Sequence, residues 1–229
     1  MGLTCLMVTV PVLAGRDALP PDYPASLERE LALVQSQIAA KGATIDQLVA
    51  AAELYLDSAD DLFQEEGQKR LAYESAAEMA KRALQLDERH AHAHFLYAAA
   101  LGSAERIKGL ANAGLVLSEI KTHVRRAIDL DPTHAQALQM LGGLYAELPW
   151  LLGGSEKEAE TYLRRAIAAD GRYTNAHLLL ARLLIKQGRP ADARPHLDAV
   201  LHAEQPHYPY TWQRRFRPEA ERLLKALSQ

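Results

Sequence analysis

The sequence lacks several features that would point to particular classes of protein. It has one cysteine, Cys5, among 229 residues, which excludes a disulfide within one chain and a site built from several thiolates. It has only three Phe and two Trp, and its apolar content is mostly Ala and Leu, which favour helix over sheet. The formal net charge of −3 gives none of the basic excess typical of nucleic-acid-binding proteins. No internal run approaches the ~20 apolar residues that a membrane span needs, so no integral membrane span is expected.

A short apolar run at residues 3–14 begins the chain and is about as long as the core of a signal peptide. Val12, Leu13 and Ala14 resemble the small-residue cleavage pattern, with Gly15 as the first mature residue. No Lys or Arg precedes the run, which departs from an ordinary signal. The pattern predicts a periplasmic or otherwise exported protein, and a cytoplasmic one is the alternative.

Prolines then mark a linker, because proline fixes φ and removes a backbone donor. They stand at Pro20, Pro21 and Pro24. We therefore expect residues 1–24 to form the remnant of a signal peptide and a Pro-rich linker. Residues 25–229 are expected to form a single helical domain.

Apolar residues at three- and four-residue steps then indicate one face of a first helix. They are Leu27, Leu31, Val34 and Ile38. Gly42 is expected to end this helix, and Thr44 to cap the next one.

A repeat motif of paired helices is the strongest pattern in the chain. Its first helix has the form Leu-x-x-Leu-Gly-x-x-Tyr after an Asp-Pro pair, and its second the form Ala-x-x-x-Leu-x-x-Ala. Ala166 and Val200 hold equivalent places in two successive units and are 34 residues apart, which is the period of this repeat class. The positions that define the two units are Pro132, Leu138, Leu141, Gly142, Tyr145, Ala159, Leu163, Ala166, His177, Leu180, Ala181, Leu184, Ala193, Leu197 and Val200.

The small residues of the motif have a structural reason. We expect the two helices of a pair to cross at Gly142 and at Ala181, where a larger side chain would force the backbones apart. Two less regular units precede these, and the segment from Pro218 to Leu227 has the amphipathic pattern of a capping helix. The predicted fold is all-α: a superhelix of about four helix pairs, with an N-terminal helix and a C-terminal capping helix.

The spacing of the earlier units is irregular. Ala83 and Ala127 are 44 residues apart, and Ala127 and Ala166 are 39 apart, so both units are longer than the standard period. The extra residues fall at 102–117 and 148–156, and insertions in such arrays go to loops or helix ends on one face. We expect the stack to curl more tightly than an open superhelix.

The units from about Asp46 to Pro206 resemble the tetratricopeptide-repeat (TPR) superfamily. The segments 145–149 and 152–160, the run 98–102, taken as a turn, and the long segment before 125–132 are similar to exported bacterial proteins of the TRAP-transporter T-component (TatT-like) group. That resemblance implies a transporter accessory that associates with a periplasmic substrate-binding protein or holds an apolar ligand. The architecture is also similar to the eukaryotic regulator-of-microtubule-dynamics family.

Three segments carry residues that could do chemistry. His90, His92 and His94 include a pair at zinc-ligand spacing, but the Glu of a metalloprotease motif is missing, so we expect ordinary groove or surface histidines and no metal. The Gly-Gly-Ser at 153–155 lacks the ending of a phosphate loop and is expected to cap a helix. The aromatic and basic residues at 206–217 are expected to fasten the capping helix rather than to bind nucleic acid.

The function expected is binding, and not catalysis, because no catalytic set can be argued from spacing, and no cofactor is expected. In TPR units the second, fifth, ninth and twelfth residues of the first helix face the concave groove. Counted from the start of three units, this rule selects Ala99, Gly102, Gly143 and Ala146 together with the eight candidate binding residues His92, Phe95, Gln136, Gln139, Asn175, Leu178, Arg182 and Ile185. We expect this groove to bind a partner protein or peptide, and Arg182 favours a carboxylate. The alternative is a transporter accessory or a carrier of a small apolar or acidic ligand.

Overall fold

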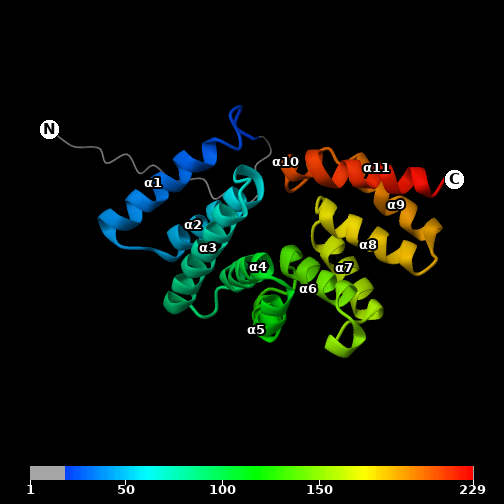
Figure 1. Cartoon of the computed structure of the whole chain (residues 1–229), viewed down its shortest axis with the longest axis horizontal. Helices are drawn as coiled ribbons and strands as arrows, with labels where there is room; N and C mark the ends of the chain where they lie inside the picture. The colour runs from blue at the N-terminus through cyan, green and yellow to red at the C-terminus, as the bar shows by residue number, and fades with distance from the viewer. Residues whose placement is uncertain (1–18, 229) are drawn as a thin grey trace.

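The computed structural model describes residues 19–228, and every regular element in that range is a helix (Figure 1). This confirms the all-α prediction for the described part of the chain. None of its helices is both long and apolar enough to cross a membrane. The apolar run at 3–14, with the predicted cleavage after Ala14 and with Cys5, lies outside the described residues.

Four helix pairs follow a single N-terminal helix, α1 (Ser26–Lys41), as the repeat pattern predicts. The pairs are α2 (Ile45–Asp57) with α3 (Glu66–Leu86), α4 (Ala91–Lys108) with α5 (Leu110–Leu130), α6 (Ala135–Glu147) with α7 (Glu156–Ala169), and α8 (Thr174–Lys186) with α9 (Pro190–Leu201). Short helical turns lie at η1 (Ser58–Leu62) and η2 (Trp150–Leu152). The chain ends with α10 (Pro209–Thr211), η3 (Trp212–Phe216) and α11 (Arg217–Ala226).

The predicted helix boundaries at the N-terminal side are confirmed. Gly42 follows α1 with φ +79°, a conformation that glycine adopts without strain. Thr44 caps α2: its hydroxyl accepts a hydrogen bond from the amide of Gln47, whose side chain bonds back to the Thr44 amide. Ser155 likewise caps α7 by accepting from the amide of Glu158.

The turns that join successive pairs share one construction. An aspartate follows the second helix of each of the first three pairs, and its amide closes the last helical turn. Its carboxylate then accepts a hydrogen bond from the amide two residues later, which bends the chain into the next helix. The three bonds join Asp87 to Arg89 (2.8 Å), Asp131 to Thr133 (2.9 Å) and Asp170 to Arg172 (2.9 Å).

The helices of a pair cross where the sequence has its smallest residues. A Cβ atom on Gly142 would lie 2.8 Å from Cγ of Leu163 and 3.1 Å from its backbone nitrogen, so only glycine fits this crossing of α6 and α7. Ala159, Ala166 and Ala181 are fully buried at the same seams. These contacts confirm the register taken from the motif.

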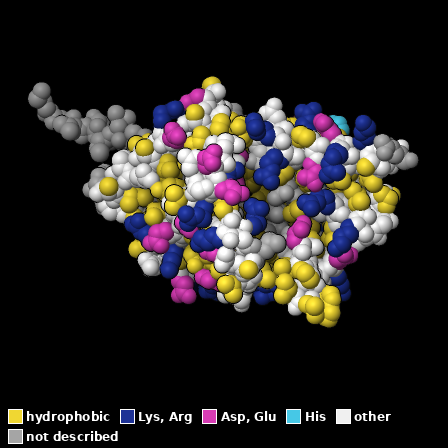
Figure 2. Space-filling model, in the orientation of Figure 1, with side chains coloured by type: hydrophobic (Ala, Val, Ile, Leu, Met, Phe, Trp, Pro, Cys, Tyr) yellow, Lys and Arg dark blue, Asp and Glu magenta, His cyan; other side chains and the backbone are white. Residues whose placement is uncertain are grey.

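The two insertions have different structures. The segment 98–102, taken as a turn, lies inside α4, so that prediction is wrong: the extra residues before Leu117 lengthen α4 and α5. The insertion before α7 forms η2, whose side chains Trp150, Leu151 and Leu152 are 79%, 74% and 56% exposed. Figure 2 shows hydrophobic side chains gathered at the lower edge of the molecule, where Figure 1 draws the chain leading into α7.

The helix pairs form an arch, with α1–α3 on one side, α4–α6 at the bottom and α8–α11 on the other side (Figure 1). The C-terminal segment crosses the open side of this arch. Thr211 of α10 donates a hydrogen bond to Asp61 of η1, 150 residues away in sequence, at 2.9 Å. The stack thus curls until its two ends meet, as the irregular spacing predicts.

The last helix packs on the final pair. Ala220 of α11 is fully buried against α9, and Leu223, Leu224 and Leu227 pack on the same apolar cluster. Trp212 fastens the segment by donating from Nε1 to the carbonyl of Val200 at 2.7 Å. The interpretation of 218–227 as a cap over the last pair therefore agrees with the structure.

Candidate functional site

A cavity of about 360 Å³ lies on the inner side of the arch. The first helices of all four pairs contribute to its wall, and the segments 19–23 and 207–216 cover it. Its aromatic lining residues are Tyr23, Phe95, Tyr173, Tyr208, Tyr210 and Phe216, and its ionisable carboxyl groups are those of Glu53, Asp57, Asp60 and Asp61. The volume lies in the range of sites for small molecules or for one or two side chains of a partner.

Side-chain contacts between distant segments close the cavity. Asp61 accepts hydrogen bonds from the hydroxyls of both Tyr23 and Thr211, so it joins the N-terminal segment to the C-terminal one. The rings of Tyr23 and Tyr210 meet edge to face, with centroids 5.2 Å apart. Tyr208 accepts a hydrogen bond from Gln136 of α6 at 2.7 Å. The cavity is therefore a product of the closed arch and not of any single repeat.

Glu53 of α2 lies at the end of a chain of two histidines on the cavity wall. Its Oε1 lies 2.6 Å from Nε2 of His92 on α4, and Nδ1 of His92 lies 3.0 Å from Nε2 of His134. Nδ1 of His134 is 3.2 Å from the amide of Ala137, and a backbone amide can only donate. His134 therefore donates from Nε2 to His92, and His92 donates from Nε2 to Glu53.

The ionisation of His134 supports this direction of hydrogen bonding. Burial, together with the neighbouring His92, lowers the pKa of His134 to about 4, so the ring is neutral at pH 7. The other oxygen of Glu53, Oε2, is buried and has no hydrogen-bond partner within the described part of the chain. One oxygen of the carboxylate is thus held by the histidines, and the other has no hydrogen-bond partner among the described residues.

The remaining polar groups of the wall are shaped by burial. Burial raises the pKa of the Asp60 carboxyl, whose Oδ1 accepts a hydrogen bond from Tyr73. Burial also raises the pKa of Tyr208, and the nearby charges of Asp57 and Glu53 raise it further. His207 has its pKa lowered, mainly by burial. The described wall therefore holds four carboxyl groups against one guanidinium, that of Arg215.

The structure separates the eight predicted groove residues into two groups. Phe95, Gln136 and Asn175 line the cavity, and His92 stacks on Phe95 beside it, with ring centroids 5.7 Å apart. The other four lie outside its lining. Leu178 is buried and Ile185 half-buried in the apolar cluster of the last pair, and Gln139 is half-buried near Gly143.

Arg182, expected to hold a carboxylate of a ligand, lies among carboxylates of the protein itself. Its guanidinium is 3.5 Å from Glu147 and 3.8 Å from Glu219 of α11. The charge available in the cavity is instead mainly negative. This arrangement favours a cationic partner over an acidic one.

Sequence reasoning missed the carboxylates of α2, although the groove rule reaches one of them. Counted from Ile45, the first residue of α2, the ninth residue is Glu53 and the twelfth is Leu56, and both line the cavity. It also missed Tyr208 and Tyr210, because the segment 206–217 was assigned wholly to fastening the cap. Tyr208 and Tyr210 line the cavity, whereas Trp212 packs on the last helix pair, so the segment serves both purposes.

The three histidines of the H-x-H-x-H run have separate contacts. His90 caps α4 by accepting from the amide of Ala93, His92 bonds to Glu53, and His94 lies 2.9 Å from His123. No group of three or more His, Cys, Asp or Glu side chains that could hold a metal ion occurs among residues 19–228.

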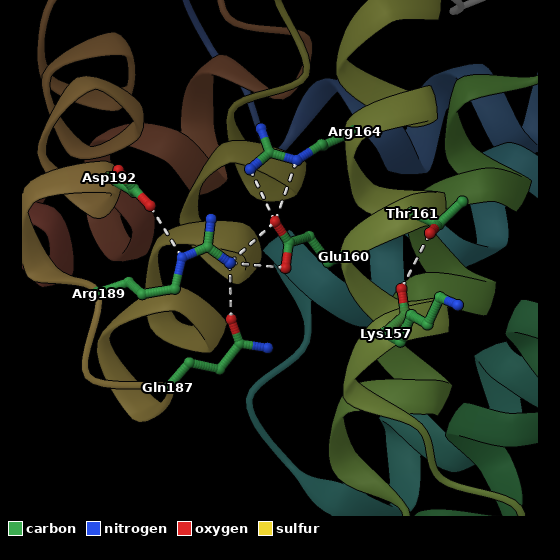
Figure 3. A network of polar contacts seen from close by, with 7 residues as sticks. All are labelled: Lys157, Glu160, Thr161, Arg164, Gln187, Arg189 and Asp192. Carbon is green, nitrogen blue, oxygen red and sulfur yellow. Dashed lines mark hydrogen bonds and ion pairs between the residues drawn. The ribbon is translucent and has the colours of Figure 1, made fainter.

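A second, shallow hollow is lined by α7 and the turn before α9, and three of its charged side chains, Glu160, Arg164 and Arg189, are paired with one another (Figure 3). Arg189 contacts both oxygens of Glu160, at 3.1 and 2.9 Å, and Asp192 at 2.8 Å. Arg164 approaches the same glutamate at 2.8 Å. This network ties the last two helix pairs together, and we assign it a structural role.

Comparison with known proteins gives a family and a fold. Residues 25–228 match the family described as regulator of microtubule dynamics protein 1-3. Regulator of microtubule dynamics protein 1 of Bos taurus is 34% identical over 135 residues, which cover 51% of this chain and 41% of the relative. The protein of the same name from Homo sapiens is also 34% identical, over the same shares of the two chains. The match thus spans less than half the length of these relatives.

Two solved structures share the architecture. A thermophilic TPR protein of Thermus thermophilus superposes with a TM-score of 0.64 at 19% identity, over 86% of this chain and 91% of that one. MamA (41-end) from Desulfovibrio magneticus gives 0.52 at 15% identity, over 78% and 86%. These likenesses confirm the TPR-like fold. The matches support the similarity to the regulator family and lend no support to the resemblance to the transporter component.

Proposed function

This chain belongs to the regulator of microtubule dynamics protein 1-3 family, and from that premise we propose that it is a non-catalytic helical-repeat module that binds a segment of a partner protein in the cavity of its arch. The observation that carries the proposal is the cavity itself. Four helix pairs and both terminal segments contribute to it, and its aromatic walls offer the large, rigid contact area that binding sites use.

Variants of the cavity wall test this proposal. Partners would be captured from a lysate by photo-crosslinking, and then measured as purified pairs by calorimetry. We expect Phe95→Ala and Asn175→Ala to weaken a true partner by at least ~10-fold, since each removes a contact that faces the cavity. Gln68→Ala, on the exposed start of α3, is the matched control. A partner that binds the wild type and all three variants equally would show that the cavity is not the binding site.

The name of the relatives makes tubulin a partner to test. We propose this only as one identity of the partner, because the matched segment covers 41% of the bovine relative. Co-sedimentation with assembled microtubules would measure it, again with Phe95→Ala beside the wild type. Sedimentation that the variant leaves unchanged would place any microtubule contact elsewhere.

A second function is favoured by the size and lining of the cavity. A volume of about 360 Å³ suits a carrier of a small ligand, and the carboxyl groups favour a ligand with a cationic end rather than an acidic one. Native mass spectrometry of the purified protein distinguishes the two functions. A carrier retains a small molecule, whereas a peptide-binding module is recovered without one.

We also propose that the protein is exported and cleaved after Ala14. In the same proposal, residues 1–24 precede a single domain at 25–229. The apolar run and the prolines support it. Expression of the full chain followed by N-terminal sequencing of the mature product tests it. A product that keeps Met1 contradicts it.

A further inference from the structure

We propose that the cavity binds a primary ammonium group, such as the end of a lysine side chain of the partner, and that Glu53 is the residue that receives it. The inference rests on the proposed function and adds the chemical class of the ligand. Nothing in the groove predicted from the sequence pointed to this class, because Arg182 suggested the opposite charge.

The unsatisfied oxygen of Glu53 is the first observation. Oε2 is buried without a hydrogen-bond partner among the described residues, while Oε1 is held 2.6 Å from Nε2 of His92. A buried acceptor without a donor costs free energy that a ligand can recover. The ligand that fits must therefore donate a hydrogen bond, and a positive charge on the donor strengthens that bond.

The histidine chain behind Glu53 is the second observation. His134 is fixed by the amide of Ala137, and it orients His92, which orients the carboxylate. Both rings thus act as positioning residues, because they hold one oxygen of Glu53, while the other has no hydrogen-bond partner among the described residues. A carboxylate fixed in this way loses little conformational entropy when a ligand binds.

The walls around Glu53 are the third observation. Phe95, Tyr173 and Tyr208 line the same cavity, and aromatic faces attract cations and accommodate the alkyl chain of a lysine. Asp57 and Asp60 add two more carboxyl groups to the wall, where the described lining has one guanidinium, that of Arg215. An anionic ligand would meet carboxyl groups from α2 and η1, whereas an ammonium meets both charge and aromatic surface.

The occupant most consistent with these groups is a side chain with a long apolar stem and a cationic end. Lysine has such a stem and three donors at its end. A quaternary ammonium has the charge but no hydrogen to donate, so it would leave Oε2 of Glu53 unsatisfied. This difference separates a general cation site from the one proposed.

Three small probes and two variants test the inference on the full chain. The probes are n-pentylammonium, tetramethylammonium and n-pentanol, measured by calorimetry or by ligand-observed NMR. The variants are Glu53→Gln, which keeps the size of the side chain and removes its charge, and Glu204→Gln, at an exposed position after α9, as the matched control. Circular dichroism of each variant verifies the fold.

We expect n-pentylammonium to bind the wild type and Glu204→Gln with the same Kd, and Glu53→Gln at least ~10-fold more weakly, as for loss of a hydrogen bond to a charged group. Tetramethylammonium and n-pentanol should bind the wild type at least ~10-fold more weakly than n-pentylammonium, because neither combines the charge with a donor. Equal binding of n-pentylammonium to Glu53→Gln and the wild type would overturn the inference. So would equal binding of n-pentanol and n-pentylammonium to the wild type, a comparison that needs no variant.

The two proposals fail separately. Equal affinity for the alcohol and the ammonium leaves the cavity as a binding site and removes only its preference for charge. Failure of all three probes to bind overturns the ammonium inference, while the capture experiment with Phe95→Ala decides on the partner. A partner that depends on Phe95 but not on Glu53 would keep the proposed function and discard the ammonium.

Discussion

Glu53 and His92 lie 39 residues apart in sequence, on the first helices of neighbouring pairs, and join with 2.6 Å between Oε1 and Nε2. The His92 and Glu53 side chains are only 22% and 12% exposed, so each supplies a partner to a polar group that is largely removed from water. The ring of His92 also stacks on the rings of Phe95 and His134. This contact therefore serves both the stability of the fold and the shape of the cavity.

The variant His92→Phe tests how much the contact between Glu53 and His92 contributes to the stability of the fold. Phe keeps the ring and removes the donor, so the Glu53 carboxylate loses its partner in a mostly buried place. We expect the free energy of unfolding to fall by about 1–3 kcal/mol. Urea denaturation measures it, and His202→Phe, at an exposed position, should stay within about 0.5 kcal/mol of the wild type. A His92→Phe protein as stable as the wild type would contradict the buried contact.

Two histidines with lowered pKa values predict that the fold loses stability in acid. Burial and a neighbouring histidine lower the pKa values of His134 and His196 to about 4, below the ordinary 6.5. The unfolded chain therefore binds more protons than the folded chain between these values. The stability that each neutral ring contributes is fully present above pH 6.5 and is lost as the pH falls toward about 4. Urea titrations at stepped pH should show this decline.

A double variant serves as the control for that decline. His134→Gln with His196→Gln removes the two rings whose pKa values are lowered to about 4, so its unfolding free energy should vary less than that of the wild type as the pH falls from 6.5 toward 4. Carboxyl groups titrate mostly at the acid end of this window or below it. A slope that the double variant leaves unchanged would assign the acid sensitivity to other groups.

The crossing of α6 and α7 predicts a cost for any side chain at Gly142. A Cβ there would lie 2.8 Å from Cγ of Leu163 and 3.1 Å from its backbone nitrogen. We expect Gly142→Ala to lower the free energy of unfolding by about 1–3 kcal/mol, as for overpacked cores. Gly67→Ala is the matched control, because a Cβ at Gly67, near the start of α3, meets nothing within 4 Å. That change should stabilise by up to about 1 kcal/mol. Thermal or urea unfolding compares the two.

The closure of the arch predicts a local effect at Asp61. Asp61→Ala removes the acceptor shared by Tyr23 and Thr211, so the segment 207–216 should lose contact with η1. Hydrogen exchange of that segment should become faster, with a loss of about 1–3 kcal/mol in global stability. Asp129→Ala, at an exposed position on α5, should leave both measurements unchanged. Unaltered exchange at 207–216 in Asp61→Ala would mean that the arch is held closed by other contacts.

Much of this fold could be predicted because its determinants are local. Small residues at Gly142 and Ala181 fix the crossings, and Thr44 and Ser155 fix the helix starts, each within a few positions of the structure they specify. The prediction of a turn at 98–102 was wrong. No residue of that run ends the helix, and α4 continues through it.

The cavity could be predicted only in part because its determinants are distant from one another. The groove rule reached Phe95, Gln136 and Asn175 through the repeat pattern. It would have reached Glu53 had α2 been counted as a first helix, but that unit lacks the Leu-x-x-Leu-Gly motif that marks the clearest repeat. No local pattern indicates that Thr211 meets Asp61, because 150 residues separate them and only the total curvature of the stack brings them together.

The contacts between the two ends of the stack are weaker than the contacts between neighbouring helix pairs. Neighbouring helix pairs share fully buried apolar side chains, whereas the ends are joined mainly by hydrogen bonds and ring contacts at Asp61, Tyr23 and Tyr210. Each such bond contributes about 0.5–1.5 kcal/mol net, less than separating two helices that share a core. We therefore expect the arch to open first at the contacts between its ends, while every helix pair stays intact, and this opening would widen the access of a ligand to the cavity.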